Sequence, residues 1–268
     1  ADVTVTRIAH DEFLWVTGSA SVARDASWIS RHREPDMQVE VVDVSGSYAV
    51  IGLMGPKSRD LLNSLSRADL SDAAFPFSTS QLIDVGPFTV RATRLTYVGE
   101  LGWELYVPAE FAVGVYDLVK ESGVEIRDAG YYAINALRLE KGYRAFGPEL
   151  NPTYNPIEAG LGFTCKLNTD IDFLGRAAVE QAKAEGVKRR LVSLVLDSPD
   201  PMMWGGELVL RDGVAVGQVT SAAFGTTTNA CVALAYIWNP AGTAVTTEFL
   251  TTGSYVINIG GELNSATL

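Results

Sequence analysis

The chain has 268 residues, 47% of them hydrophobic and 20% charged, which suits one large or two smaller globular domains and excludes a disordered or fibrous class. Its formal net charge of -11 argues against a nucleic-acid or anionic-membrane surface, because both require clustered lysine and arginine. Cys165 and Cys231 lie far apart without CxxC spacing and are expected to be free, so neither a disulfide framework nor a zinc site is indicated. A serine-hydrolase triad would need one of the two histidines beside a GxSxG elbow, and the sequence has no such elbow.

The first 121 residues alternate between strand and helix patterns. Apolar residues with a period of two predict strands, and apolar residues with helical spacing predict helices between them. This order indicates an α+β domain with a mostly antiparallel sheet. The predicted strands are 2–8, 12–17, 38–44, 48–53, 80–85, 88–95 and 103–107, and the predicted helices are 19–33, one that starts at 55–56, and 109–121.

The remainder of the chain changes character after one more helix. That helix, 131–143, has apolar residues around nearly its whole circumference and is therefore predicted to be buried. From residue 189 onward, strand patterns recur about every ten residues with glycine-rich turns, which is typical of a small β-barrel or sandwich. We place the boundary between two domains, 1–187 and 188–268, near residue 187. The predicted barrel strands are 190–196, 207–211, 215–222, 231–237, 244–250 and 255–259.

The segment 96–106, with the sequence TYVGELGWELY, carries most information about chemistry. Gly99 and Gly102 supply the backbone freedom for a tight turn between two strands. In the second strand the period of two places Glu104 and Tyr106 on the face opposite Trp103. Glu104 is then either a solvated strand glutamate or a pocket carboxylate between tyrosines, suited to a flat heterocycle that donates hydrogen bonds.

Four downstream segments extend this motif: AGYYAINALRLEKGY at 129–143, NPIEAGLG at 155–162, DFLGR at 172–176 and GQVTS at 217–221. In this order, the set resembles the folate-binding aminomethyltransferase family, which includes the T-protein of the glycine cleavage system. It is most similar to the folate-binding portions of dimethylglycine and sarcosine oxidases and dehydrogenases. The resemblance implies a ferredoxin-like folate-binding domain followed by a small C-terminal β-barrel.

The resemblance also implies roles for three residues. Glu104 matches the family glutamate that holds the pterin ring, and a carboxylate can accept two parallel hydrogen bonds from a 2-amino-pyrimidinone edge. Tyr97 matches a tyrosine near the folate, although a core tyrosine is the alternative. Asp2 matches an aspartate near the folate amines that is considered catalytic, and the alternative is a frayed terminal residue. About a hundred residues that precede this strand in the family are expected to be missing from the chain.

One sequence position indicates to which branch of the family the chain is more similar. The glycine-cleavage branch has a folate-contacting arginine at the position of Ile134, and the amine-oxidising branch lacks it. Arg138, Glu140 and Arg144 could alternatively form structural ion pairs, because their spacing on a helix permits it.

The implied reaction is capture of a one-carbon unit. An amine of tetrahydrofolate attacks the CH2=N+ carbon of an iminium derived from an N-methyl amine, the demethylated amine leaves, and 5,10-methylenetetrahydrofolate forms. No GxGxxG flavin fingerprint is present, so FAD is expected only in an upstream domain or partner subunit. The alternatives are a folate-binding or regulatory module without catalysis and a standalone aminomethyltransferase. With no leader or membrane-span pattern, a cytoplasmic or mitochondrial-matrix location is expected, without nucleic-acid or membrane partners.

Overall fold

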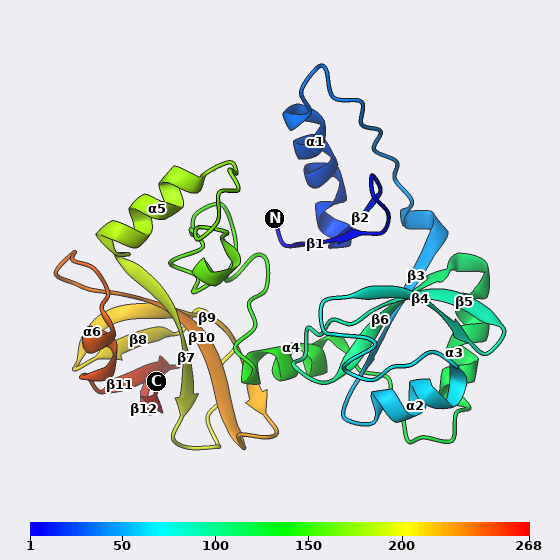
Figure 1. Cartoon of the computed structure of the whole chain (residues 1–268). Coiled ribbons are helices and arrows are strands. Elements are labelled where there is room, and N and C mark those ends of the chain that lie inside the picture. Colours follow the sequence, from blue (N-terminus) through cyan, green and yellow to red (C-terminus); the bar gives the residue numbers. More distant parts are fainter. The chain divides into compact units, whose positions relative to one another are not determined.

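The computed structural model describes all residues from 1 to 268 and divides into two compact units, 1–129 and 130–268 (Figure 1). The first unit begins with an antiparallel pair of strands, β1 (Val3–Arg7) and β2 (Phe13–Thr17), followed by helix α1 (Val22–His32). The strand predicted at 38–44 is wrong, because this segment has no regular structure. Its alternating valines are exposed and its backbone has no neighbouring strand with which to pair.

A four-stranded antiparallel sheet forms the main part of the first unit, with the strand order β3-β6-β5-β4. Helices α2 and α3 pack against one face of this sheet (Figure 1). Leucine, valine and aromatic side chains from that face and from the two helices form a buried core. The bounds are β3 (Tyr48–Met54), α2 (Ser58–Leu65), β4 (Ser80–Val85), β5 (Phe88–Thr93), β6 (Gly102–Pro108) and α3 (Ala112–Lys120).

Strand β6 confirms the predicted alternation. Trp103, Leu105 and Val107 are fully buried in the core beneath the helices. Glu104 and Tyr106 therefore point to the opposite face of the sheet, since successive side chains of a strand alternate between faces. The indole of Trp103 is thus separated by the sheet from the carboxylate of Glu104.

The two glycines of the turn serve different purposes. Gly99 has a φ of 76°, a left-handed conformation that a turn requires and that glycine adopts without strain. Gly102 has no positive φ but lies against β3, where a Cβ atom at this position would be 2.4 Å from the carbonyl oxygen of Leu53. Gly102 is therefore required by the close approach of two strands and not by the turn.

Replacing Gly102 with alanine is expected to lower the free energy of unfolding by about 1–3 kcal/mol, the usual cost of an overpacked site. Urea denaturation followed by circular dichroism measures this loss. Gly46→Ala is the matched control, because a Cβ atom there meets no other atom within 4 Å. Equal midpoints for the two variants would show that β3 can move away from position 102 at no cost.

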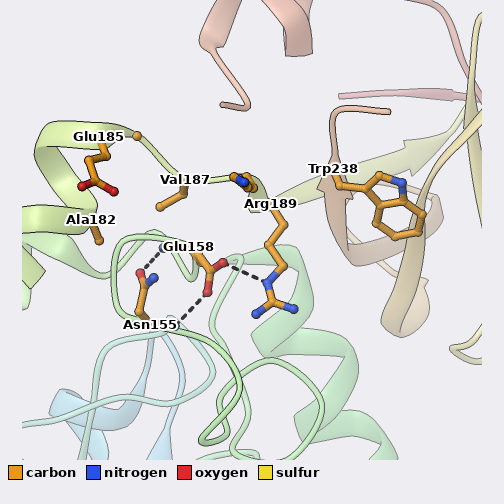
Figure 2. A pocket seen from close by; sticks show the side chains of 9 residues that line it. Asn155, Glu158, Ala182, Glu185, Val187, Arg189 and Trp238 are labelled. Carbon is orange, nitrogen blue, oxygen red and sulfur yellow. Dashed lines mark hydrogen bonds and ion pairs between the residues drawn. The ribbon is translucent and has the colours of Figure 1, made fainter. Parts of the chain in front are cut away.

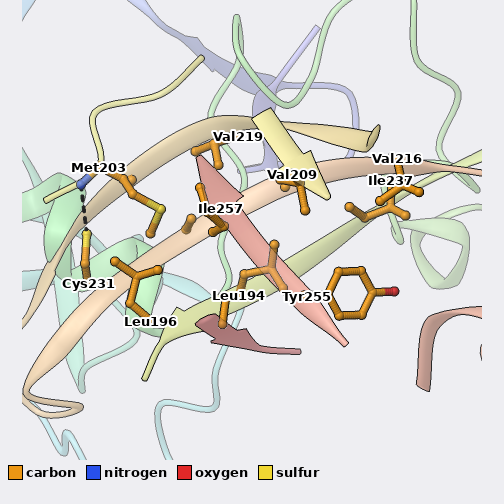
Figure 3. Close-up of a cluster of buried hydrophobic side chains, with 14 of the residues drawn as sticks. Leu194, Leu196, Met203, Val209, Val216, Val219, Cys231, Ile237, Tyr255 and Ile257 are labelled. Carbon is orange, nitrogen blue, oxygen red and sulfur yellow. Dashed lines mark hydrogen bonds between the residues drawn. The ribbon is translucent and has the colours of Figure 1, made fainter. Parts of the chain in front are cut away.

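The second unit contains helices α4 (Tyr131–Glu140) and α5 (Arg176–Glu185) and a closed six-stranded barrel. Aliphatic side chains from all parts of the barrel fill its interior, among them Leu194, Val209 and Ile257 (Figure 3). The predicted α+β fold followed by a β-barrel is therefore confirmed. The barrel order is β10-β7-β12-β11-β8-β9, with β7 (Arg189–Leu196), β8 (Leu208–Arg211), β9 (Val214–Gly225), β10 (Ala230–Trp238), β11 (Tyr255–Ile259) and β12 (Glu262–Thr267).

Two predictions in this unit were wrong in detail. The segment predicted as a strand at 244–250 overlaps helix α6 (Thr247–Thr251), where the Thr246 hydroxyl accepts a hydrogen bond from the Phe249 backbone amide at the helix start. The helix predicted to be buried all round is buried only at Arg138 and Leu139, and Tyr131 and Tyr132 are 89% and 83% exposed. Helix α5 and the polar strand β12 were not predicted.

Helix α4 packs on β9 and β10, and this contact places the start of the second compact unit at residue 130. The compact units therefore divide at a different position from the domain boundary predicted near residue 187.

Short 3₁₀ turns lie at Ser19–Ser21, Ser45–Ser47, Ala109–Phe111 and Gly162–Thr164. None of the helices combines the length and the apolar character needed to cross a lipid bilayer.

A buried ion pair joins α4 to the barrel. The Nη1 atom of Arg138 lies 3.0 Å from Oε2 of Glu149, and both side chains are almost completely buried. The other oxygen of Glu149 accepts hydrogen bonds from the hydroxyl groups of Thr220 and Ser221 on β9, each at 2.6 Å. Arg138 also donates to the Asn135 side chain. This arrangement satisfies both charges inside the unit and assigns Arg138 a structural role.

Two other polar residues of this region also bond to the backbone. Glu140 accepts hydrogen bonds from the amides of Thr227 and Thr228, and Arg144 donates to the carbonyl oxygens of Gly142 and Ala159. Both side chains therefore stabilise loops of the second unit through hydrogen bonds to the backbone. Burial lowers the pKa of Arg144 from its ordinary value.

Candidate functional site

The candidate site lies on the face of the four-stranded sheet that points away from α2 and α3. We call this the outer face and define it by Glu104 and Tyr106 on β6 and by their partners in the neighbouring strands. Glu104 is paired with Gly52 on β3 and Thr93 on β5, and Tyr106 is paired with Val50 and Arg91. Side chains that are paired across antiparallel strands share one face, so these residues form a continuous surface.

Glu104 and Tyr106 are in direct contact. The Tyr106 hydroxyl donates a hydrogen bond to Oε2 of Glu104 over 2.5 Å, a short distance typical of an O–H group facing a carboxylate. Tyr106 is only 4% exposed, and Glu104 is partly exposed. Burial, together with the charge of Glu104, raises the pKa of Tyr106 above its ordinary value. The phenol therefore keeps its proton and acts as a donor at neutral pH.

The sheet is open beside Glu104. Gly52 is exposed, and a Cβ atom at this position would meet only the end of the Met54 side chain, at 3.9 Å. A glycine inside a strand often marks a place where a ligand approaches the backbone. The outer face thus combines a partly buried carboxylate, that of Glu104, with exposed backbone at Gly52 that carries no side chain. A planar ring that presents two N–H donors, such as the pyrimidinone edge of a pterin, fits this combination.

The structure places the other predicted site residues as follows. Tyr97 lies in the loop between β5 and β6, ahead of the strand that carries Glu104, and is 38% exposed. Asp2 is exposed and immediately precedes β1. Because β1 pairs with β2 in a sheet of its own, the strand pairing does not bring Asp2 and Glu104 together. Asp2 therefore remains a candidate on the basis of the sequence alone.

The sequence reasoning missed one feature of the site and underestimated another. Gly52 was not recognised, although a glycine inside the alternating run 48–53 could have indicated a bare patch on one face of the strand. Tyr106 was placed on the correct face, but its hydrogen bond to Glu104 depends on the side-chain torsions. Strand alternation specifies the shared face and leaves such contacts open.

A separate groove of about 600 Å³ lies in the second unit, near the start of β7 (Figure 2). Its carboxylate Glu158 accepts hydrogen bonds from Nε of Arg189 and from the backbone N–H of Asn155, both at 2.9 Å. Arg189 also lies over the ring of Tyr154, with its Cζ atom 4.6 Å from the ring centroid. The Glu158 carboxylate of this groove is thus already engaged by groups of the second unit.

Comparison with known proteins finds family models that together cover most of the chain. The GCVT N-terminal domain model matches residues 1–169, and the model of the glycine cleavage T-protein C-terminal barrel domain matches residues 189–268. The chain is 40% identical to mitochondrial sarcosine dehydrogenase of Mus musculus over 273 residues, covering 96% of this chain and 30% of that protein. It is 41% identical to mitochondrial dimethylglycine dehydrogenase of Homo sapiens over 240 residues, covering 88% and 28%.

A solved structure supports the fold. The crystal structure of the glycine cleavage system aminomethyltransferase T from Bartonella henselae covers 99% of this chain with a TM-score of 0.82, at 20% sequence identity, and the match spans 70% of that protein. The chain thus spans about a third or less of the two dehydrogenases and most of the aminomethyltransferase. With family models matched in order along most of its length, the chain belongs to the glycine cleavage T-protein family of aminomethyltransferases.

Proposed function

We propose that the outer face binds a tetrahydrofolate and that the chain captures a one-carbon unit from an iminium derived from an N-methyl amine. The observation that carries this proposal is the Glu104 carboxylate, held by Tyr106 beside the bare backbone of Gly52. The similarity to sarcosine and dimethylglycine dehydrogenases supports the amine class. In this proposal the chain is the folate-binding part of a larger flavin-dependent enzyme, and FAD belongs to a different domain or subunit.

The residues of the chain would act by placement and charge. Glu104 accepts two hydrogen bonds from the pyrimidinone edge and fixes the orientation of the ring. Tyr97 lines the same folate site. A bound tetrahydrofolate supplies the nucleophilic amine. Asp2 stabilises the positive charge of the iminium and accepts the proton that the amine loses. Because the electrophile is already a cation, an anion and accurate placement account for most of the catalysis.

The same proposal keeps the domain division at 1–187 and 188–268, with the folate-binding domain first and the barrel domain second. The separate family-model matches at 1–169 and 189–268 support this division. The packing of α4 on the barrel then represents contact between a segment of the first domain and the second domain.

Replacing Glu104 with glutamine is expected to weaken tetrahydrofolate binding at least tenfold, because one arm of a charged two-point hydrogen bond is lost. Isothermal titration calorimetry under anaerobic conditions measures the affinity. Trp103 fluorescence is a poor reporter, since the indole is buried on the helix side of the sheet.

Glu100→Gln is the matched control, because Glu100 belongs to the same motif but lies in the turn before β6. We expect this variant to bind tetrahydrofolate as the unchanged protein does. Equal affinities for the unchanged protein and Glu104→Gln would refute the proposed site.

A further inference from the structure

We propose that Tyr106 is a positioning residue that holds Glu104 in its ligand-binding orientation. This inference rests on the proposed function and extends it to a residue with no assigned role. The Tyr106 hydroxyl holds the Glu104 carboxylate by a hydrogen bond to Oε2. Without this contact, the carboxylate would stand on an open surface, because its cross-strand neighbour Gly52 has no side chain to confine it.

The backbone that carries the two residues is held in place by strand pairing. Strand β6 is paired on both sides at Glu104 and at Tyr106, with β3 on one side and β5 on the other. The tyrosine side chain has only two torsions and is almost completely buried, so its hydroxyl position is well defined. A glutamate side chain has three torsions, and ordering it costs conformational entropy. Because the Tyr106 hydrogen bond already orders the Glu104 side chain in the free protein, ligand binding does not have to order it. The site is therefore pre-organised.

The hydrogen bond also shapes what the carboxylate can bind. Each carboxylate oxygen has two acceptor positions, and the Tyr106 hydroxyl occupies one of those on Oε2. The remaining position on Oε2 and both positions on Oε1 stay available for donors. Since every free position is an acceptor, the site selects a ring edge with two adjacent N–H groups and rejects one that presents a carbonyl oxygen there. The ring of the proposed tetrahydrofolate, a 2-amino-4-oxo pterin, has such an edge, and its 2-oxo counterpart does not.

The test is a double-mutant cycle between Tyr106→Phe and Glu104→Gln in the full chain, with tetrahydrofolate affinity measured by calorimetry. Phenylalanine keeps the ring and removes the hydroxyl. We expect Tyr106→Phe to weaken binding about tenfold, which is the scale of one charge-assisted hydrogen bond. In the Glu104→Gln background the same substitution is expected to change the affinity by less than about twofold, because there is no carboxylate left to orient.

Tyr116→Phe is the matched control, because the Tyr116 hydroxyl also donates to a carboxylate, that of Asp128 at 3.0 Å, but on helix α3. It should leave tetrahydrofolate affinity unchanged. A tetrahydropterin without the aminobenzoyl-glutamate tail should show the same fold-loss with Tyr106→Phe as tetrahydrofolate does, since Tyr106 acts at the ring edge. Thermal unfolding of all variants separates a loss of fold from a loss of orientation.

The outcomes are distinct. Unchanged affinity of Tyr106→Phe, or an equal loss in both backgrounds, would overturn the positioning role while a weak Glu104→Gln variant still supported the folate site. If Tyr106→Phe does not fold, Tyr106→Met takes its place in the same double-mutant cycle. The expected affinities are the same as those for Tyr106→Phe. If the unchanged protein binds no tetrahydrofolate, or Glu104→Gln binds it normally, both the proposed function and this inference fail.

Discussion

Replacing Glu149 with alanine is expected to lower the free energy of unfolding by about 3–5 kcal/mol, which is a large part of the stability of a typical domain. The substitution leaves the Arg138 guanidinium buried without its carboxylate, and an uncompensated buried charge is strongly unfavourable. It also removes the acceptor of the Thr220 and Ser221 hydroxyl groups. Chemical denaturation followed by circular dichroism measures the loss.

Two controls identify the buried charge as the cause. Glu180→Ala breaks the exposed Arg176–Glu180 pair of α5 and should cost no more than about 0.5 kcal/mol. The double variant Arg138→Met with Glu149→Leu removes both charges, so it should be more stable than Glu149→Ala alone. Equal stabilities for Glu149→Ala and Glu180→Ala would show that the ion pair does not hold α4 to the barrel.

Replacing Asp2 with alanine is expected to leave tetrahydrofolate affinity unchanged and to slow one-carbon transfer by about 100-fold, the lower end of the usual contribution of a general base. The iminium that is not captured hydrolyses, so release of free formaldehyde should rise. The assay uses a protein in which this chain is joined to an amine-oxidising flavin domain, because that domain supplies the iminium. The ratio of 5,10-methylenetetrahydrofolate to formaldehyde is the measured quantity.

Asp11→Ala is the control for Asp2, because Asp11 is also an exposed aspartate and lies in the connection between β1 and β2. It should leave the product ratio unchanged. A ratio that is the same for Asp2→Ala and the unchanged protein would remove Asp2 from the mechanism. The product ratio is the deciding measurement, because Asp2 precedes β1, and the strand pairing places β1 in a different sheet from Glu104.

Local sequence pattern was sufficient where a segment has one dominant periodicity. The alternation in β6 correctly separated Trp103 from Glu104, and strands β4 and β11 start and end at the predicted residues. Strand prediction from periodicity failed where strand formation depends on a neighbouring strand. The valines of 38–44 alternate as in a strand, yet no neighbouring strand pairs with them. The polar strand β12 forms because β11 and β7 pair with it.

The sequence by itself determined the family, the α+β-then-barrel order and the face of β6 that carries Glu104. These follow from local periodicity and from motifs that lie within short stretches of chain. Only the tertiary structure decided that Gly102 is required by contact with β3, that Gly52 leaves the sheet bare beside Glu104, and that Tyr106 holds the carboxylate. Each of these depends on atoms from separate strands, or on side-chain torsions, and periodicity along one strand specifies neither.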